Sequence, residues 1–205
     1  LKKDGFEFRY TFEDKLKSNL ARRLKSHGKF RVYSRQSTTY IEPLSDECDM
    51  DAAYDAAKKV FGAVGVSRAK ACAKTKEAML ETVRTYLAGN LVGEKTFKVE
   101  SKRADKSIPM TSIQLSQWVG GELDELYPNL HVDVHNPALT IHLEVRDYAA
   151  FVHADPEPGA GGLPVGINGR AVSLLSGGID SPVSSWMIAK RGVALEMVHF
   201  FSYPY

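Results

Sequence analysis

Residues 171–182 read Ala-Val-Ser-Leu-Leu-Ser-Gly-Gly-Ile-Asp-Ser-Pro. The start of this stretch, residues 171–175, is short and apolar enough for a buried parallel strand. Pro182 suits the first position of a helix, and the apolar positions that follow it run to Gly192, which supplies a stop. Residues 194–200 predict a second strand. The order of strand, loop, helix and strand therefore predicts a βαβ unit.

The loop at 176–181 has the composition of an anion-binding turn. Backbone N–H groups at the start of a helix favour a negative charge there. Gly177 and Gly178 let the backbone approach a phosphate without a Cβ in the way. The spacing matches neither a Walker A loop nor a dinucleotide-binding fingerprint, and the loop contains no lysine. An anion held here would therefore contact backbone amides and the polar side chains of the loop.

Those polar side chains are Ser176, Asp180 and Ser181. Beside a polyphosphate, the carboxylate of Asp180 would be repelled unless a cation bridges the two, so it indicates Mg²⁺ or contact with an attacking group. The alternative is a purely structural junction, in which Asp180 or Ser181 caps the helix.

Ser-Gly-Gly-x-Asp-Ser after a strand resembles the PP-loop of the N-type ATP pyrophosphatases, which cleave ATP between its α and β phosphates. The wider sequence is similar to one family of these enzymes, the tRNA 4-thiouridine synthetases or tRNA uridine 4-sulfurtransferases, which are also linked to thiamin thiazole synthesis. Residues 109–112, 120–121 and 132–137 resemble the RNA-binding THUMP domain of that family. The segments similar to the rest of the family are 159–166, 174–182, 190–193 and 198–200.

The resemblance implies an enzyme that binds ATP with Mg²⁺ and has tRNA as its partner. Such an enzyme transfers AMP to O4 of the uridine at position 8 of tRNA and then replaces the activated oxygen with sulfur. The sulfur comes from a persulfide, supplied by a cysteine desulfurase or another donor. Asp180 is the implied catalytic residue. The implied ATP contacts are Leu174, Leu175, Ser176, Gly177, Gly178, Asp180, Ser181, His199 and Phe200.

The net charge is only +2, but the basic residues are clustered. Between Lys15 and Ile41 there are eight Lys or Arg residues and no Asp or Glu. A second cluster contains Lys98, Lys102, Arg103 and Lys106. Two clusters suit a long polyanion better than a small ligand, although a basic helix face is often simply solvated. The residues predicted to bind RNA are Lys15, Arg22, Arg23, Lys102, Arg103 and Lys106.

Composition indicates an ordinary soluble protein, with 43% hydrophobic and 25% charged residues. No apolar run approaches the ~18–20 residues of a membrane span, and no signal peptide is visible, so we expect a cytoplasmic protein without membrane contact. Cys48 and Cys72 lie far apart without a C-x-x-C pair, which suits a reducing cytosol. We expect no metal site, because His131, His135 and His142 lack supporting ligands at metal-binding spacing.

The predicted architecture is a mixture of α/β and α+β parts. Residues 1–66 read as a ferredoxin-like domain whose first strand is missing, and residues 67–155 as a THUMP domain. The glycine- and proline-rich segment 156–170 predicts a linker with unusual backbone freedom, although the family resemblance places it near the active site. Residues 171–205 read as the beginning of a doubly wound PP-loop domain of the adenine nucleotide alpha hydrolase type, which we expect to be truncated.

Periodicity predicts the individual elements of the first two domains. We expect the helix at 111–127 to be interrupted at Gly120-Gly121. The other expected helices are 10–26, 52–61 and 74–88, and the expected strands are 30–34, 38–42, 64–73, 96–101, 130–134, 139–145 and 149–152.

Two other functions remain open at this stage. The chain could serve only as an RNA-binding module, or it could belong to another PP-loop enzyme that modifies tRNA. An amide-forming synthetase is disfavoured, because it has no evident need for two RNA-sized basic clusters. The sequence is also compatible with a homodimer.

Overall fold

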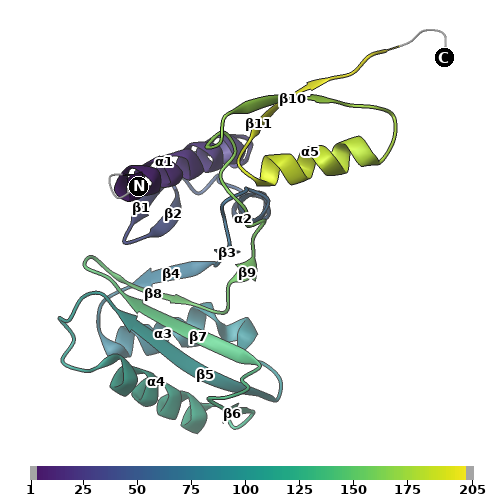
Figure 1. Ribbon diagram of the computed structural model, residues 1–205. Helices are drawn as coiled ribbons and strands as arrows, with labels where there is room; N and C mark the ends of the chain where they lie inside the picture. The colour runs from purple at the N-terminus through teal and green to yellow at the C-terminus, as the bar shows by residue number, and fades with distance from the viewer. Residues whose placement is uncertain (1–3, 202–205) are drawn as a thin grey trace. The chain divides into compact units, whose positions relative to one another are not determined.

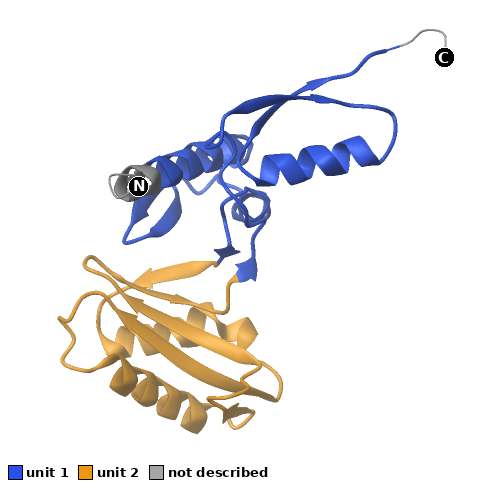
Figure 2. Cartoon of the chain, in the orientation of Figure 1, with its two compact units in different colours: residues 1–66, 157–205 blue, residues 67–156 orange. Residues whose placement is uncertain are grey.

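The structure is a computed structural model that describes residues 4–201, with the backbone alone described for residues 4–10. It contains two compact units (Figures 1 and 2). Unit 1 combines Leu1–Val66 with Glu157–Tyr205, and unit 2 is Ser67–Pro156. Within residues 4–201, no helix combines the length and the hydropathy needed to cross a membrane.

Unit 1 begins with α1 (Asp4–Leu24), which continues into the short 3₁₀ helix η1 (Lys25–His27). Strands β1 (Phe30–Arg35) and β2 (Thr38–Pro43) form an antiparallel hairpin, and α2 (Met50–Lys58) follows. These elements match the predicted helices and strands, except that α1 begins earlier than residue 10. The expectation of a missing first strand concerns residues 1–3 and the sequence before them, which lie outside the described residues.

The core of this part of unit 1 forms between α1 and α2. Leu16, Leu20 and Leu24 recur every four residues, so they share one face of α1. Small side chains of α2 let the two helices approach closely on that face, and the hairpin packs against the same cluster. The residues of α2 and its C-terminal end that are buried there are Ala53, Ala56, Ala57 and Val60.

The single strand predicted at 64–73 is wrong. The structure divides it into β3 (Gly65–Val66), which pairs with β9 (Glu157–Pro158) in unit 1, and β4 (Ala69–Cys72), which joins the sheet of unit 2. Local β-propensity cannot reveal this division, because it depends on which distant strand each half pairs with.

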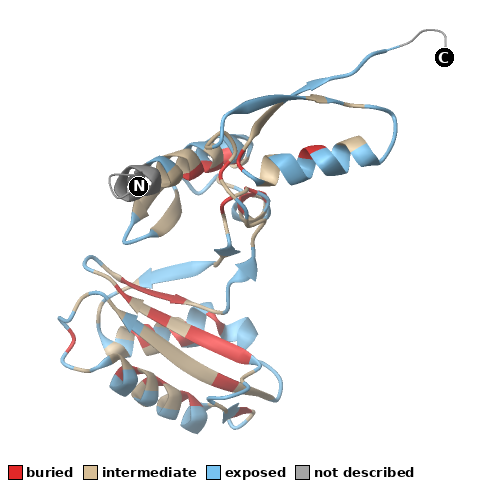
Figure 3. Cartoon of the chain, viewed as in Figure 1, coloured by how far each residue is buried: buried red, intermediate tan, exposed pale blue. Residues whose placement is uncertain are grey.

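Unit 2 is a five-stranded sheet in the order β4-β8-β7-β5-β6, with helices α3 (Lys76–Tyr86) and α4 (Ser112–Leu126) packed against it (Figure 1). The remaining strands are β5 (Lys95–Arg103), β6 (Leu130–Val132), β7 (Leu139–Val145) and β8 (Ala150–His153), and the 3₁₀ helix η2 covers Ala88–Asn90. Strand β5 is parallel to β6 and β7, whereas β8 is antiparallel to β7 and β4. Buried residues lie on the strands and on both helices of this unit (Figure 3), and they form one hydrophobic cluster.

Helix α4 is continuous, so the predicted interruption at Gly120-Gly121 is wrong. A Cβ at Gly120 would lie 3.8 Å from Cγ2 of Val99 on β5, which is ordinary van der Waals contact. The helix begins with a capping box, in which Thr111 and Gln114 each accept a hydrogen bond from the other's backbone N–H. Packing on the sheet and this cap outweigh the low helix propensity of the two glycines.

The sheet face opposite the helices carries a group of charged and imidazole side chains. The rings of His142 and His153 are stacked with their centroids 4.8 Å apart. Glu144 lies beside them, with its carboxylate 3.9 Å from Nε2 of His153 and 2.5 Å from Nη2 of Arg146. Contact with His153 and the ion pair with Arg146 lower the pKa of Glu144 to about 2.

Residues 159–168, here called the strap, are held by backbone hydrogen bonds at both ends, so the prediction of unusual backbone freedom is wrong. The first part of the strap pairs with the segment that follows α2. The amides of Gly159, Ala160 and Gly161 donate to Val64 O, Lys58 O and Ala63 O at 2.9, 2.8 and 2.8 Å, and Gly62 N donates to Gly161 O at 2.8 Å.

The second part of the strap pairs with the C-terminal end of helix α5 (Asp180–Lys190). Leu163 N donates to Lys190 O at 2.9 Å, and the amides of Gly166 and Asn168 donate to Gly192 O at 2.8 and 3.0 Å. Gly162 adopts a φ of 74°, and a Cβ there would lie 2.4 Å from Lys190 O. Only glycine combines this backbone conformation with so close an approach. The strap therefore joins the N-terminal part of unit 1 to its C-terminal part.

We predict that Gly162→Ala destabilises the chain more than Gly161→Ala. Both positions have positive φ, but a Cβ at Gly161 would meet nothing within 4 Å. Gly161→Ala should cost about 1–2 kcal/mol through backbone strain alone, and Gly162→Ala should add roughly 1–3 kcal/mol through steric overlap. Urea unfolding measures the free energy of unfolding of both variants. Equal losses would show that the strap backbone does not approach the end of α5 as closely as described.

The lowered pKa of Glu144 predicts acid sensitivity of unit 2. A carboxyl whose pKa is lower in the folded chain stabilises the fold above about pH 4.5, and this contribution is lost as pH falls towards 2. Glu144→Gln should lower the free energy of unfolding at pH 7 and make the loss below pH 4.5 less steep. Chemical unfolding at a series of pH values tests this, with Glu125→Gln on the exposed side of α4 as the control. Parallel pH curves for wild type and Glu144→Gln would contradict the prediction.

Candidate functional site

The predicted βαβ unit is present. Strands β10 (Arg170–Leu174) and β11 (Ala194–Val198) are parallel, with α5 between them, and Leu174 lies opposite Val198. Residues 175–179 form the loop at the carboxyl end of β10 (Figure 1). In α/β sheets this is the edge where ligands bind.

Helix α5 begins at Asp180, slightly earlier than expected from Pro182. Ile179 occupies the N-cap position and makes no side-chain capping bond. Asp180 is exposed in the first turn, so neither it nor Ser181 occupies the N-cap position considered in the structural alternative. The first N–H groups of a helix have no partner within it, and they remain available to an anion.

Serine hydroxyls hold the loop in shape. Ser181 Oγ accepts from the backbone N–H of Ser176 at 3.0 Å and lies 3.1 Å from Ser176 Oγ. Ser176 Oγ in turn accepts from Gly178 N at 3.3 Å. The two loop serines predicted from the motif are thus brought together, and part of their role is to shape the turn.

Two further serines connect this loop to the strand and the helix. Ser185 is buried, and its hydroxyl donates to Ser181 O at 2.6 Å. Because that bond uses its only proton, Ser185 Oγ must accept the 2.7 Å hydrogen bond from Ser173 Oγ on β10. Sequence reasoning missed both residues. The available signal was a serine inside an apolar strand together with a serine one helical turn after the loop.

The glycines of the loop leave room for a ligand. A Cβ at Gly177 would meet no atom within 4 Å, and one at Gly178 would lie 3.6 Å from Ser176 Oγ. A side chain at either position would therefore project into the space in front of the loop. The helix N-terminus and the serine hydroxyls supply hydrogen-bond donors, and the space in front of the loop supplies room. Together they suit a phosphate chain.

The other predicted ATP contacts lie at the same edge. Leu175 N donates to Val198 O at 2.8 Å, and His199 Nδ1 lies 2.8 Å from Leu175 O. Since a carbonyl oxygen can only accept, Nδ1 carries a proton and donates it to Leu175 O. Leu174 and Phe200 are exposed, by 63% and 78%. The structure thus gathers the predicted residues from two strands around one loop.

The βαβ unit keeps much of its apolar surface exposed, in contrast to unit 2 (Figure 3). The exposed side chains come from both strands and the helix. They include Val172, Leu174, Ile179, Val183, Trp186, Met197 and Phe201. Trp186 of α5 makes an edge-to-face contact with Phe61 in the N-terminal part of unit 1, with ring centroids 5.6 Å apart.

The first basic cluster is distributed along α1 and the hairpin. Arg22 and Arg23 are exposed in the last turn of α1, and Lys15 lies half-buried on the same helix. Lys15 Nζ would be 3.5 Å from a Cβ at Gly166, so the strap passes close to it.

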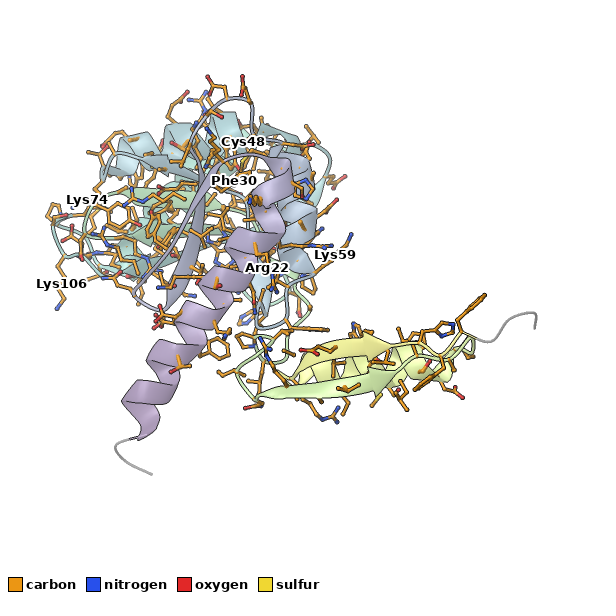
Figure 4. The ribbon with its side chains drawn as sticks, turned by 90° about the horizontal axis from the view of Figure 1, so that it is seen from above. Arg22, Phe30, Cys48, Lys59, Lys74 and Lys106 are labelled. Carbon is orange, nitrogen blue, oxygen red and sulfur yellow. The ribbon has the colours of Figure 1, made fainter. Side chains whose placement is uncertain are left out.

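The second basic cluster does not form one surface, because alternate residues of β5 point to opposite faces of the sheet. Lys98 and Lys102 share the face of Glu100, and Lys98 pairs with Glu100 at 2.6 Å. Arg103 faces the other way and donates to Ile108 O at 3.1 Å, with its Nε buried and without a partner. Lys106 is exposed in the following loop (Figure 4).

Cys48 and Cys72 are free. Among residues 11–201, whose side chains the structure describes, no group of three or more His, Cys, Asp or Glu side chains is arranged to hold a metal ion. Burial and the neighbouring charge of His153 lower the pKa of His142, which favours its neutral form.

We predict that Ser185→Ala loosens the loop while Ser184→Ala does not. Both hydroxyls donate to Ser181 O, but Ser184 is exposed and its bond is 3.1 Å long, whereas Ser185 is buried and also binds Ser173. Loss of the buried bond should cost about 1 kcal/mol and speed amide hydrogen exchange at Ser176 and Gly178. Unchanged exchange at these amides in Ser185→Ala would show that the serine chain does not support the loop.

Comparison with known proteins gives three family matches along the chain. Residues 2–67 match the ThiI ferredoxin-like domain, residues 73–155 the THUMP domain, and residues 166–205 the family described as thiamine biosynthesis protein (ThiI). A probable tRNA sulfurtransferase of Alkaliphilus oremlandii is 46% identical over 198 residues, which cover 95% of this chain and 50% of that protein. The chain spans about half the length of the curated relatives it matches.

Solved structures agree with these matches. A 4-thiouridine synthetase in complex with RNA and bound ATP superposes with a TM-score of 0.80 at 33% identity, covering 96% of this chain and 50% of that one. The protein PH1313 of Pyrococcus horikoshii has the same fold, with a TM-score of 0.83 at 24% identity over 95% of this chain and 64% of that one. Along its length the chain thus resembles, in this order, the ThiI ferredoxin-like domain, the THUMP domain and the family described as thiamine biosynthesis protein (ThiI).

Proposed function

We propose that this chain carries the tRNA-binding part and the ATP-binding loop of an ATP-dependent tRNA sulfurtransferase, which forms 4-thiouridine at position 8 of tRNA. The observation that supports this most strongly is the intact PP-loop βαβ unit, in a chain that superposes over 96% of its length on a 4-thiouridine synthetase solved with RNA and ATP. The relatives named as probable tRNA sulfurtransferases favour the same activity.

The reaction needs activation of the uridine. Its O4 carbonyl oxygen is a poor leaving group, and ATP supplies an adenylyl group that turns this oxygen into a good one. The terminal sulfur of a persulfide then attacks C4 and AMP leaves, and a second thiol breaks the remaining S–S bond, which forms a disulfide and releases the 4-thiouridine. We propose a cysteine desulfurase or another persulfide donor as the source, and the same sulfur chemistry would serve thiamin thiazole synthesis.

The loop would stabilise the charge of the phosphate groups. The first N–H groups of α5 and the hydroxyls of Ser176 and Ser181 can donate to phosphate oxygens, and Gly177 and Gly178 leave the space that the phosphates need. Asp180 is exposed and belongs to no group of three or more metal-binding side chains among the described residues, so it would hold Mg²⁺ together with phosphate oxygens rather than in a protein cage.

The adenosine part of ATP would lie against the strand ends. Leu174 and Phe200 offer exposed apolar surface there, and Leu175 and His199 are joined by the hydrogen bond that orients the imidazole. When the ring is neutral, Nε2 of His199 can accept a hydrogen bond from a ribose hydroxyl or the adenine amino group.

RNA would bind through its phosphates. We propose contacts from Lys15, Arg22 and Arg23 in unit 1 and from Lys102 and Lys106 in unit 2, which are basic residues on surfaces without a sequence-reading motif. Arg103, also predicted to bind RNA, would act by holding the loop that presents Lys106, since its guanidinium donates to Ile108 O within that loop.

We further propose a division into a ferredoxin-like domain (1–66), a THUMP domain (67–155), a connecting segment (156–170) and the beginning of the PP-loop domain (171–205). Doubly wound sheets are covered on both faces, so the exposed apolar side chains of β10, α5 and β11 suit coverage by further βα units of that domain. We also propose that the protein is cytoplasmic and that it forms a homodimer.

Asp180→Asn tests the enzymatic role directly. In the complete gene product, incubated with ATP, Mg²⁺, unmodified tRNA and a persulfide donor, this variant should form 4-thiouridine at least about 10²-fold more slowly than wild type, because charge stabilisation at the phosphates is lost. Nucleoside mass analysis gives the readout, and Glu196→Gln, an exposed carboxylate on β11, is the matched control.

Two results would contradict the proposal in different ways. No thiouridine from the wild-type protein would reject the sulfurtransferase assignment. Full activity of Asp180→Asn would leave the assignment intact and reject the role of this carboxylate.

A further inference from the structure

Unit 1 contains an open hollow of about 500 Å³ that none of the predicted ATP contacts lines. Its walls come from three segments that are far apart in the sequence. Helix α1 contributes Asn19, Arg22, Arg23 and Ser26, the end of α2 contributes Lys59 and Phe61, and the strap contributes Val165. Figure 4 labels Arg22 on α1 and Lys59 at the C-terminal end of α2.

The hollow has a concentrated positive charge. Three of its lining residues, Arg22, Arg23 and Lys59, are cationic, and within the described part of the chain no carboxylate lines it. The adjacent Lys58 behaves differently, because it pairs with Asp55 at 2.9 Å and with Glu157 at 2.7 Å. Cations at the ends of α1 and α2 also interact favourably with the helix dipoles. That effect explains each residue separately, but not their convergence on one hollow.

Asn19 links this group to the strap. Its Nδ2 donates to Val165 O at 3.1 Å, and its Oδ1 accepts from Nη2 of Arg22 at 3.4 Å. Since Val165 O can only accept, the amide orientation is fixed, and the amide oxygen must face the guanidinium. Asn19 therefore positions Arg22 at the edge of the hollow.

The shape suits a chain of phosphates better than a single anion. A second hollow, lined by Thr11, Asp14, Lys15 and Ser18, lies on the preceding turns of α1. The residues of α1 that line the two hollows are spaced three and four apart, so they lie on one face of the helix. With a rise of 1.5 Å per residue, Lys15 and Arg22 are about 10 Å apart along the axis. Phe61 adds an aromatic wall beside the cations.

We propose that this hollow is a binding groove for the RNA backbone, in which Arg22, Arg23 and Lys59 contact phosphates and Asn19 holds Arg22 in place. The groove rests on the tRNA-binding role proposed above, and it adds Lys59 and Asn19 to that role. Its ligand is a run of nucleic acid phosphodiesters.

The salt dependence of tRNA binding tests the groove. Binding of an unmodified tRNA transcript to the chain is followed by fluorescence anisotropy at increasing KCl. Each phosphate contact that is lost should reduce the slope of log K against log[salt] by about 0.7–0.9. Arg22→Gln and Lys59→Gln should each reduce the slope by this amount, and the double variant should reduce it by about twice as much. Lys59→Arg keeps the charge and should keep the wild-type slope. Lys70→Gln removes the same charge from an exposed position on β4, outside the hollow and both basic clusters, and should leave the slope unchanged.

Asn19→Ala tests the positioning of Arg22 without changing the charge of the hollow. It removes the amide oxygen that accepts from Arg22, so tRNA binding should weaken, and Asn19→Gln should bind better than Asn19→Ala. A wild-type slope in the Arg22→Gln/Lys59→Gln double variant would overturn the groove. The groove would also be overturned if the double variant lost only the binding of inorganic pyrophosphate, measured by calorimetry, because the hollow would then be a small-anion site. Absence of thiouridine formation with these slope changes intact would reject the enzyme and leave the groove standing.

Discussion

The close approach of the strap backbone to the end of α5 is the constraint on which unit 1 depends. At Gly162 the chain adopts a φ of 74° and leaves no room for a Cβ beside Lys190 O. On one side of this point the strap pairs with residues 58–64, and on the other it pairs with residues 190–192. These hydrogen bonds, together with the Phe61–Trp186 contact, connect the N-terminal helices to the PP-loop segment. Residues at the two ends of the chain thereby form one compact unit.

This arrangement relates the two kinds of chemistry proposed for the chain. The loop at 176–181, proposed to bind phosphate, and the groove on α1, proposed to bind RNA, both belong to unit 1, and the strap contacts the elements that carry each of them. The hydroxyls of Ser173 and Ser185 connect the loop to β10 and α5, and the strap fixes the C-terminal end of α5. Unit 2 contributes its own basic residues, with Lys102 on the sheet face and Lys106 on a loop held by Arg103.

Local sequence patterns were sufficient for the elements whose stabilising contacts are local. The strand, loop and helix around Gly177 were predictable because turn residues and apolar periodicity lie within a few positions of each other, and the hairpin at 30–43 was predictable for the same reason. The strap was not, since its partners at 58–64 and 190–192 are distant and glycine content alone indicates freedom rather than close contact. The division of 64–73 between two sheets likewise depends on distant strands. Asp180 and the loop serines were predictable from the motif. The roles proposed for Ser173, Ser185, Asn19 and Lys59 were not, because they depend on neighbours that are distant in the sequence.

Amide hydrogen exchange along the strap tests most directly whether the connection between the two parts of unit 1 is rigid. The amides of Gly159, Ala160, Gly161, Leu163 and Gly166 donate hydrogen bonds, so they should exchange slowly, at rates comparable to the amides of β10 and β11. Uniformly fast exchange from 159 to 166, at the rates of an unstructured peptide, would contradict the strap and return this segment to a flexible tether.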